Sequence, residues 1–237
     1  MKAVILAGGR GARLAPYTTV FPKPLVPIGD RPILEIIIRQ LLSHGIGDIC
    51  LSVGYLGELI EAYFQNGHRN LPGLNLTYMR ESRPLGTAGP LSRIPGLDGT
   101  FLVMNGDVLT TLDYRALCAF HKDAGAALTI ATRRKDVRID LGVLETNDRR
   151  ELIAYREKPV YAFDISMGVY VYEPRVLPHI RTDEYLDFPD LVHRLLSAGE
   201  KVVGFHSDDF WFDIGCREDY ELAQQEFQTR PADFCHA

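Results

Sequence analysis

Along the first 135 residues, short apolar runs alternate with stretches in which apolar residues recur at helical spacing. Five of the short runs predict buried strands, at residues 2–7, 48–53, 74–79, 101–104 and 126–131. The stretches between them predict helices, at residues 32–44, 56–64, 87–93 and 112–124. Thr87 is expected to cap the third helix. Such alternation is typical of a mostly parallel sheet with helices on both faces, which predicts a Rossmann-like α/β fold.

The pattern becomes more mixed after residue 135. Four runs predict strands, at residues 142–145, 151–156, 164–173 and 202–206, and helices are predicted at 187–198 and 217–228. This part is expected to contribute antiparallel pairs. Because the sequence contains no linker or repeat, its 237 residues are expected to form one domain. We divide it into a first half (about 1–135), a second half (about 136–227) and a tail (228–237) that frays from Arg230 onward.

Composition limits the class of protein further. Hydrophobic residues make up 46% and charged residues 24%, as in ordinary globular proteins, and the net charge is −5. A mildly acidic chain without basic runs argues against nucleic-acid binding. The sequence has neither a secretory signal nor the apolar stretch of about 20 residues that a membrane span needs. The four cysteines form no CxxC pair, so we expect reduced thiols and a cytoplasmic protein.

A glycine-rich loop, residues 8–14 (Gly-Gly-Arg-Gly-Ala-Arg-Leu), follows the first strand. Glycines let backbone N–H groups approach phosphate oxygens closely, and Arg10 and Arg13 add bidentate donors. Further along, Pro22 and Pro24 stiffen the chain around Lys23 and leave its ammonium little freedom. The loop is neither a Walker loop nor a dinucleotide fingerprint, which argues against an oxidoreductase. The simpler alternative is a tight strand exit with solvated arginines.

The run from Leu6 to Leu14, followed by Phe21-Pro22-Lys23-Pro24, resembles the motifs of the sugar-1-phosphate nucleotidylyltransferases. Within that family the chain looks most like the mannose-1-phosphate guanylyltransferases, and the resemblance covers about residues 1–227. It implies an enzyme whose first half binds an NTP and whose second half binds a sugar 1-phosphate. It also implies that the glycine-rich loop contacts the nucleotide through Ala7, Gly8, Gly9, Arg10 and Gly11.

The resemblance places three further residues beside the nucleoside: Glu81, Gly86 and Thr87. Family members that use uracil or thymine commonly carry glutamine at the first of these positions. A carboxylate is an acceptor only, so Glu81 could accept from both the N1–H and the 2-amino group of guanine. We therefore expect GTP. The alternatives are that Glu81 pairs with Arg80 or Arg83, and that the donor is UTP, dTTP or CTP.

Two aspartates are candidate metal ligands. Asp107 follows the strand at 101–104, at the edge where open α/β sheets bind ligands. Asp213 is the single acid in an apolar run, where a charge is costly unless it is paired or metal-bound. The resemblance assigns both to one Mg²⁺, whose remaining positions would be filled by phosphates and water. The alternative is that they cap helices beginning near Leu112 and Arg217.

The sugar phosphate is assigned to four residues by the same resemblance: Gly142, Glu157, Lys158 and Ser166. In the family the glutamate accepts sugar hydroxyls, the lysine binds the phosphate, and the backbone of the glycine lies beside the sugar. Relatives commonly have Asn-Ala-Gly where this chain has Ser-Met-Gly at 166–168, so the identity of the sugar stays open. The alternative for Glu157 and Lys158 is an exposed ion pair.

The implied reaction is attack of a sugar 1-phosphate oxygen on the α-phosphorus of the NTP. The resemblance makes Arg13, Lys23 and Asp107 the catalytic residues. Mannose 1-phosphate, or a related hexose or heptose 1-phosphate, is the expected acceptor; glucose 1-phosphate and N-acetylmuramic acid 1-phosphate remain alternatives. An inactive nucleotide-sugar-binding regulatory relative would be expected to lack one of the charged site residues, and none is missing. Many guanylyltransferase relatives carry a repeat domain that is absent here, so any homo-oligomer is expected to form through the catalytic domain.

Overall fold

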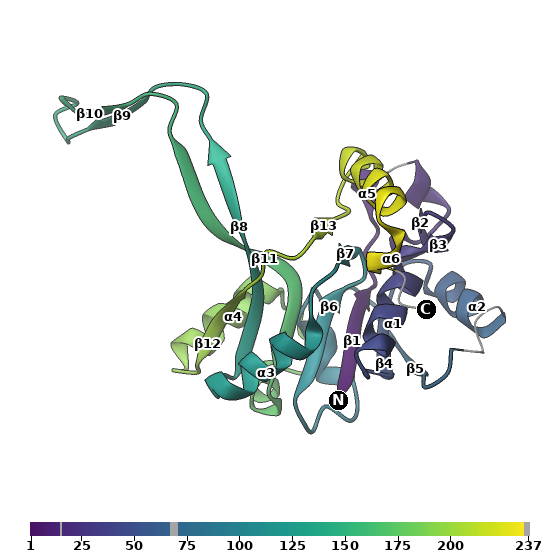
Figure 1. Ribbon diagram of the computed structural model, residues 1–237. Coiled ribbons are helices and arrows are strands. Elements are labelled where there is room, and N and C mark those ends of the chain that lie inside the picture. The colour runs from purple at the N-terminus through teal and green to yellow at the C-terminus, as the bar shows by residue number, and fades with distance from the viewer. Residues whose placement is uncertain (15, 67–70, 235–237) are drawn as a thin grey trace.

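A mixed sheet of seven strands forms the centre of the computed structural model, which describes residues 1–14, 16–66 and 71–234 (Figure 1). The strands lie in the order β12-β8-β11-β6-β1-β4-β5. Their bounds are Val202–His206 (β12), Leu128–Arg138 (β8), Val160–Tyr172 (β11), Phe101–Asn105 (β6), Lys2–Ala7 (β1), Asp48–Val53 (β4) and Asn75–Arg80 (β5). β6, β1, β4 and β5 run parallel, whereas β11 is antiparallel to both of its neighbours. The Rossmann-like fold expected from the sequence is confirmed.

The central strand β1 is buried on both faces. Val4 pairs in register with Cys50 of β4 and Val103 of β6, and none of the three exposes more than 2% of its surface. Successive side chains of a strand point to opposite faces. Accordingly, Ala3 and Ile5 belong to one hydrophobic cluster and Val4 to another. A continuous apolar run is what such a strand requires.

Helices cover both faces of the sheet. The α-helices are α1 (Ile33–Ser43), α2 (Gly57–Asn66), α3 (Tyr114–Ala124), α4 (Phe188–Ser197), α5 (Arg217–Thr229) and α6 (Pro231–Phe234). The short 3₁₀ helices are η1 (Ala12–Leu14), η2 (Tyr17–Thr19), η3 (Lys23–Leu25), η4 (Gly89–Arg93) and η5 (Pro174–His179). α4, η4 and η5 pack on the face that contains Val4, and the other α-helices pack on the face that contains Ile5. No helix in the described part of the chain is long and apolar enough to cross a membrane.

The expected cap at Thr87 is wrong. The short helix η4 begins two residues later, at Gly89, after Ala88. The hydroxyl of Thr87 instead accepts a hydrogen bond of 2.7 Å from the backbone N–H of Phe188, the first residue of α4. The backbone N–H of Thr87 donates to Asp187 at 3.1 Å. Thr87 therefore stabilises a helix that lies a hundred residues further along the chain.

Two short strand pairs outside the main sheet were not anticipated from the sequence. β7 (Val108–Thr110) pairs antiparallel with β13 (Trp211–Asp213), and β2 (Pro27–Ile28) pairs with β3 (Arg31–Pro32). Runs of two or three residues are too short for a periodic pattern to identify. The first pair is the more important one, because it joins the chain after Asp107 to the segment that ends at Asp213.

The tail is ordered further than expected. Residues from Arg230 onward were predicted to fray, yet α6 follows α5 directly. Phe234 is fully buried and packs against Phe210 and Phe227, with ring centroids 5.1 and 5.7 Å away. An aromatic side chain of this size fixes a short helix that has little stability of its own. Residues 235–237 lie outside the described range.

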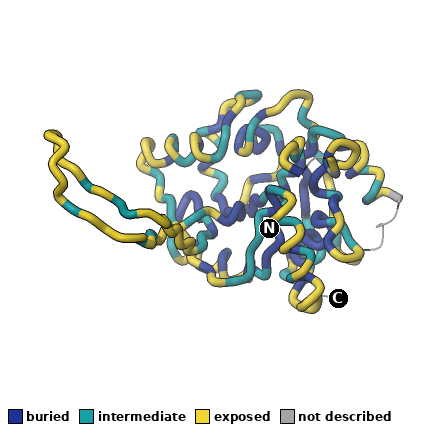
Figure 2. The backbone as a smooth tube through the Cα atoms, turned by 90° about the horizontal axis from the view of Figure 1, so that it is seen from above, coloured by how far each residue is buried: buried dark blue, intermediate teal, exposed yellow. Residues whose placement is uncertain are grey.

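β8 and β11 continue well beyond the body of the molecule. They were expected at 126–131 and 164–173, but they pair without interruption from Ser166↔Thr132 out to Val160↔Arg138. Beyond them β9 (Val143–Thr146) and β10 (Leu152–Arg156) form a second hairpin. Figures 1 and 2 show the result, a long two-stranded projection with mostly exposed residues. β9 and β10 lie close to the strands expected at 142–145 and 151–156, but the extension of β8 beyond residue 131 was missed because charged side chains on both faces hide the strand periodicity.

Burial of Phe234 makes a prediction about the tail. We expect Phe234→Ala to lower the free energy of unfolding by about 3 kcal/mol, since it removes a buried aromatic side chain. Leu222→Ala on the exposed side of α5 serves as the control and should change it by less than about 0.5 kcal/mol. Urea denaturation measures both variants. Equal stability of the two would mean that the tail frays after all.

Candidate active site

A cleft lies at the carboxyl ends of the parallel strands, where open α/β sheets bind ligands. Its larger cavity has a volume of about 520 Å³ and is bordered by residues at the ends of β1, β4, β5 and β6, namely Ala7, Gly54, Glu81 and Asn105. A second cavity of about 330 Å³ adjoins it, because Thr87 and Asn105 line both. The two together could hold a molecule with two parts.

Most of the predicted site residues meet in this cleft. The larger cavity is lined by Ala7, Gly8, Gly9, Arg10, Lys23, Glu81, Gly86, Thr87 and Asp107. The smaller one is lined by Ser166 and Asp213. Gly11 and Arg13 line neither cavity: Gly11 packs against Lys23, and Arg13 is exposed. Gly142, Glu157 and Lys158 border neither cavity, since they belong to the projecting hairpin (Figure 1).

The glycines of the loop differ in what surrounds them. A Cβ atom on Gly8 would lie 2.9 Å from Oε1 of Glu81 and 3.3 Å from the backbone nitrogen of Gly54, so a larger residue would displace the Glu81 carboxylate. Gly11 has a φ of +61°, and a Cβ there would meet the side chain of Lys23 at 2.9 Å. Gly9, in contrast, faces open space within the cavity. The loop is therefore held from behind and presents its backbone to a ligand.

Lys23 is fixed by its neighbours as the sequence suggested. It begins the 3₁₀ helix η3, in which Leu25 N donates to the carbonyl oxygen of Pro22 at 2.9 Å. Only 9% of Lys23 is exposed, and its ammonium forms an ion pair with Oδ2 of Asp107. A buried lysine needs such a partner. The lysine and the predicted metal ligand consequently form one charged unit.

Asp107 and Asp213 are brought together by the pairing of β7 with β13. Asp213 pairs with Val108, and Ile214 N donates to the backbone oxygen of Asp107 at 3.1 Å. The pKa of Asp213 is raised, first by burial and then by the negative charge of Asp107, while the charges of Lys23 and Arg13 lower it. Neither aspartate caps a helix. That alternative is wrong, because Asp113 precedes α3 and Cys216 precedes α5 as their N-caps.

The residues present fit a magnesium ion. Oδ1 of Asp107 is buried and has no hydrogen-bond partner among the described residues. No cluster of three or more His, Cys, Asp or Glu side chains suited to a metal occurs in that part of the chain. Mg²⁺ does not need such a cage, since it is typically bound by one or two carboxylates together with substrate phosphates and water. Asp107 and Asp213 would supply the two carboxylates.

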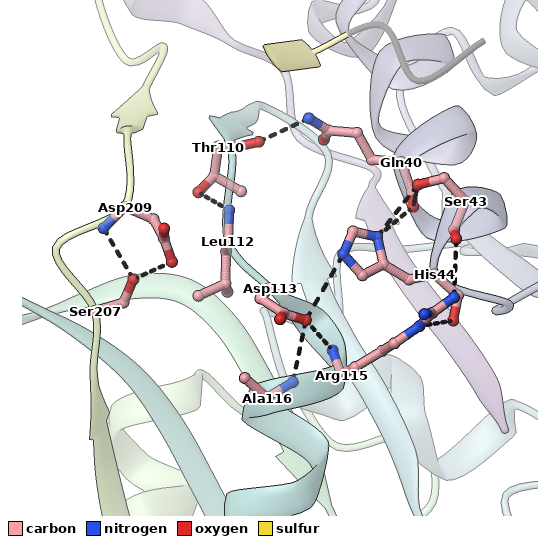
Figure 3. Close-up of polar contacts among 10 residues, drawn as sticks. All are labelled: Gln40, Ser43, His44, Thr110, Leu112, Asp113, Arg115, Ala116, Ser207 and Asp209. Atoms are coloured by element: carbon pink, nitrogen blue, oxygen red, sulfur yellow. Dashed lines mark hydrogen bonds and ion pairs between the residues drawn. The ribbon is translucent and has the colours of Figure 1, made fainter.

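Polar contacts behind β7 fix the strand that follows Asp107 (Figure 3). Nε2 of Gln40 in α1 donates to the carbonyl oxygen of Thr110 at 2.7 Å. The hydroxyl of Thr110 donates to the carbonyl oxygen of Phe210 at 2.7 Å and accepts from Leu112 N at 3.1 Å. β7 is thus attached to a helix on one side and to the chain before β13 on the other. These supporting residues carry no sequence motif that could have identified them.

The two arginines of the loop occupy different positions. Arg10 lines the larger cavity, and its guanidinium lies 5.8 Å from the ring centroid of Tyr55. Arg13 lies in η1 and reaches toward the other aspartate, since a Cβ on Gly215 would be 3.5 Å from its Nη1 and Nη2 atoms. Its charge also lowers the pKa of Asp213. Arg10 therefore borders the larger cavity, whereas Arg13 lies near Asp213.

Glu81 is oriented by contacts that were not foreseen. Its Oε1 accepts from the hydroxyl of Ser52 at 2.9 Å and its Oε2 from Leu85 N at 3.1 Å. The alternative that it pairs with a neighbouring arginine is wrong. Arg80 pairs with Glu61, and Arg83 donates to the backbone oxygen of Asp183. Ser52 could have been noticed as a hydroxyl in an otherwise apolar strand.

The wall opposite the loop comes from residues that the sequence analysis missed. Tyr185 and Asp187 line the larger cavity, and the tyrosine hydroxyl donates to Oδ2 of the aspartate at 2.8 Å. Gly86 packs against this segment so closely that a Cβ would lie 2.5 Å from the backbone oxygen of Leu186, and its φ is +78°. No local pattern marks Tyr185 as a site residue, because only tertiary packing brings it to the cleft.

The residues predicted to bind the sugar phosphate lie in two separate parts of the structure. Ser166 lies in the second cavity, where its hydroxyl donates to the Tyr170 hydroxyl at 3.2 Å and accepts from Gly168 N at 3.3 Å. Glu157 lies on the projecting hairpin, and its carboxylate accepts from the hydroxyl of Tyr155 at 2.6 Å. Lys158 follows it, with a φ of +46°. The second cavity and the Glu-Lys-Pro motif are thus separate within one chain.

The comparisons with known proteins agree with this geometry. The model of the nucleotidyl transferase family matches residues 2–230. The chain therefore belongs to the nucleotidyl transferase family, and the resemblance seen in the motifs is confirmed.

Several relatives are named as sugar-1-phosphate nucleotidylyltransferases. The chain is 34% identical over 240 residues to a UTP–glucose-1-phosphate uridylyltransferase from Synechocystis, covering 93% of this chain and 61% of the relative. It is 34% identical over 232 residues to a mannose-1-phosphate guanyltransferase from Neurospora crassa, covering 93% of this chain and 62% of the relative. It therefore spans about three-fifths of these two proteins.

A relative of similar length and two solved structures complete the comparison. The chain is 33% identical to the D-glycero-α-D-manno-heptose 1-phosphate guanylyltransferase of Aneurinibacillus thermoaerophilus over 231 residues, which cover 96% of this chain and 99% of the relative. HddC from Yersinia pseudotuberculosis has 27% identity and a TM-score of 0.71, covering 95% of this chain and 99% of that one, and it has also been solved with GMP-PN. A structure from Bacillus anthracis, 23% identical with a TM-score of 0.74 over 95% of this chain and 94% of that one, supports the fold alone.

The raised pKa of Asp213 makes a prediction about stability. A carboxyl whose folded pKa exceeds its unfolded value binds protons more tightly when folded, so stability falls as pH rises through that window. We expect Asp213→Asn, which carries no charge, to have a higher Tm than wild type at pH 7 in the presence of a chelator. The difference should shrink below about pH 4, where the unfolded-state carboxyl is protonated.

Calorimetry across this pH range measures the effect, with Asp208→Asn as a control, since that carboxylate is 91% exposed. A lower Tm for Asp213→Asn at pH 7 without metal would contradict the repulsion between the two aspartates.

Proposed function

We propose that the protein transfers a nucleotidyl group from an NTP to a sugar 1-phosphate, with GTP as donor and mannose 1-phosphate or a related hexose or heptose 1-phosphate as acceptor. The observation that carries the proposal is the charged unit of Lys23, Asp107 and Asp213 beside the glycine-rich loop. A nucleotide in the larger cavity would place its phosphates against that unit. The adjoining cavity would then receive the sugar.

In the proposed reaction, a phosphate oxygen of the sugar 1-phosphate attacks the α-phosphorus of the NTP. A new oxygen–phosphorus bond forms, the bond between the α-phosphorus and the bridging oxygen breaks, and pyrophosphate leaves with its electron pair. Because the nucleophile is already anionic, no general base is needed. Catalysis then depends on positioning and on neutralising charge. Lys23 would contact the reacting phosphates, Arg13 the departing pyrophosphate and Lys158 the sugar phosphate.

Magnesium is the proposed cofactor, held by Asp107 and Asp213. When bound it would neutralise phosphate charge and polarise the α-phosphate. Lys23 would keep Asp107 in a fixed orientation through the ion pair that the two form. The backbone of Gly8 and Gly9 would approach the base, since the first is packed against Glu81 and the second faces open space.

The choice of GTP is supported by the acceptor capacity of Glu81. Each carboxylate oxygen accepts one hydrogen bond within the protein, so lone pairs remain for the two adjacent donors of guanine. The guanylyltransferase relative that matches this chain over 99% of its own length is in accord with that choice. A pyrimidine nucleotide is the second candidate, because the Synechocystis relative is a uridylyltransferase; its acceptor would be glucose 1-phosphate or N-acetylmuramic acid 1-phosphate.

We place the enzyme in the cytoplasm and expect neither a nucleic-acid nor a membrane partner. The described cysteines Cys50, Cys118 and Cys216 are free thiols, which suits a reducing compartment. A regulatory protein without activity is disfavoured, because all of the charged residues needed for the reaction are retained: Arg13, Lys23, Asp107, Lys158 and Asp213.

The proposed catalytic residues make a direct prediction. Asp107→Asn and Lys23→Ala should each reduce kcat for pyrophosphate release by about 10²–10³-fold, since each removes charge stabilisation at the reacting phosphates. Lys122→Ala is the control, because this exposed lysine lies on α3, away from the cleft. A coupled pyrophosphate-release assay gives the rates. Turnover close to wild type in both site variants would refute the proposed mechanism.

The proposed role of Glu81 predicts the nucleotide preference. In a grid of five NTPs against several sugar 1-phosphates, wild type should prefer GTP. Glu81→Gln should lower kcat/KM for GTP by roughly 10–100-fold, because hydrogen bonds to a charged acceptor are among the stronger ones. Glu61→Gln, which alters a carboxylate paired with Arg80 outside the cavity, is the matched control. A wild-type preference for UTP or dTTP would contradict the assignment.

A further inference from the structure

The projecting hairpin, residues 133–163, is a regular extension of the central sheet and is called the arm below. β8 and β11 pair in unbroken antiparallel register from Arg133↔Ile165 to Arg138↔Val160. Ile139 N then donates to the carbonyl oxygen of Pro159 at 3.0 Å, and β9 pairs with β10 at the tip. The direction of the arm, away from the body in Figure 1, is therefore set by backbone hydrogen bonds.

The arm exposes more apolar surface than a two-stranded ribbon should. Figure 2 shows it as mostly exposed, with no buried residue. Seven large apolar side chains on it are each more than half exposed: Leu141, Leu144, Leu152, Ile153, Tyr155, Val160 and Phe163. An isolated two-stranded hairpin is only marginally stable in water, and clustered exposed apolar residues mark an interaction surface. The arm thus requires a partner.

The second cavity of the cleft has no cationic side chain, whereas the arm carries one in Lys158. The residues that line it include no lysine or arginine, and its one charged group is the carboxylate of Asp213. A sugar phosphate placed there would meet a negative charge and would need a cation from elsewhere. Lys158, with Glu157 beside it, lies in the middle of the arm, between β10 and β11. The cavity of one chain and the motif of the same chain are therefore complementary but apart.

Charge favours a second copy of this chain as the partner. The arm contains eight Lys or Arg and six Asp or Glu residues, whereas the whole chain has a net charge of −5. The arm is thus net positive, and the remaining body carries a net charge of −7. Opposite charges on two surfaces steer their association and fix its register. An arm of one copy is attracted to the body of another.

We propose that two copies exchange arms in a symmetric dimer, so that Glu157 and Lys158 of each copy complete the sugar-side cavity of the other. The identity of the bound group as a sugar phosphate rests on the proposed function; the exchange itself does not. Closure of the arm over its own cavity would require a bend at its base, where the register between β8 and β11 shifts between Ser166 and Tyr170. Exchange leaves the arm in the direction that the structure gives it, and a two-fold axis makes both contacts equivalent.

The first test concerns oligomeric state. Analytical ultracentrifugation of the wild-type chain at micromolar concentration should give a dimer. Leu144→Glu combined with Leu152→Glu places charges on the apolar tip and should give a monomer that still binds GTP in calorimetry. Leu196→Glu on α4 is the matched control, because that leucine is also exposed but lies on the body. A monomeric wild type would overturn the proposal.

The second test asks whether the arm reaches the other chain, without using activity. Lys158→Cys and Pro189→Cys place thiols on the arm and on the lining of the second cavity. Under mild oxidation, the double variant should give a dimer-sized band on a non-reducing gel, whereas each single variant serves as a background control. A disulfide within one chain, which leaves the band at monomer size, would overturn the exchange and indicate closure over the chain's own cavity.

The third test uses activity. Lys158→Ala and Asp107→Asn should each be nearly inactive, but co-refolding them in equal amounts should restore about a quarter of wild-type activity, since each mixed symmetric dimer has one complete site. Lys23→Ala mixed with Asp107→Asn is the control and should restore none, because both lesions lie in the cleft itself. An active, dimeric wild type without complementation would overturn the exchange and leave the function intact. No activity with any NTP would refute the function alone.

Discussion

The central constraint of this structure is the cost of holding two carboxylates close together at the end of a sheet. Burial disfavours the charged form of Asp213, and repulsion by Asp107 adds to that cost, so the pKa of Asp213 is raised. Lys23 offsets part of it through its ion pair with Asp107. The rest of the fold serves this arrangement: the β7–β13 pair sets the separation, and Gly11 leaves room for the lysine. The proposed catalytic geometry is retained against a local electrostatic penalty.

Much of the fold follows from the sequence, because the strands of a parallel sheet are continuous apolar runs that a simple pattern detects. β1, β4 and β6 lie within a residue of where they were expected. The short pair β7–β13 was not predictable, since two or three residues carry no periodicity. The part of β8 that extends into the arm was not predicted, for another reason. Its residues at 133–138 are charged and solvated on both faces, and sequence patterns identify strands by the face that they bury.

The candidate site likewise contains residues that could be predicted from the sequence and residues that could not. Residues on motifs, such as Gly8, Lys23 and Asp107, could be placed because local backbone requirements dictate their types. Tyr185 and Ser52 could not, because they reach the cleft or orient a site residue only through tertiary packing. Thr87 illustrates the difference, since it lines the cleft with the other predicted site residues but contacts a different helix from the one it was expected to cap. Residue type indicates what a side chain can do, whereas packing decides which partner it meets.

The packing of α5 has a consequence for the order in which the site is completed during synthesis. Tyr220 and Gln224 of this helix donate to the carbonyl oxygen of Pro27, and Gly29 N donates back to Gln224. They hold the chain just after Lys23 from nearly the other end of the sequence. A ribosome exposes the glycine-rich loop and its lysine well before α5, which follows Pro27 by more than 190 residues. The nascent chain therefore carries an incomplete form of the proposed phosphate site until α5 has left the exit tunnel.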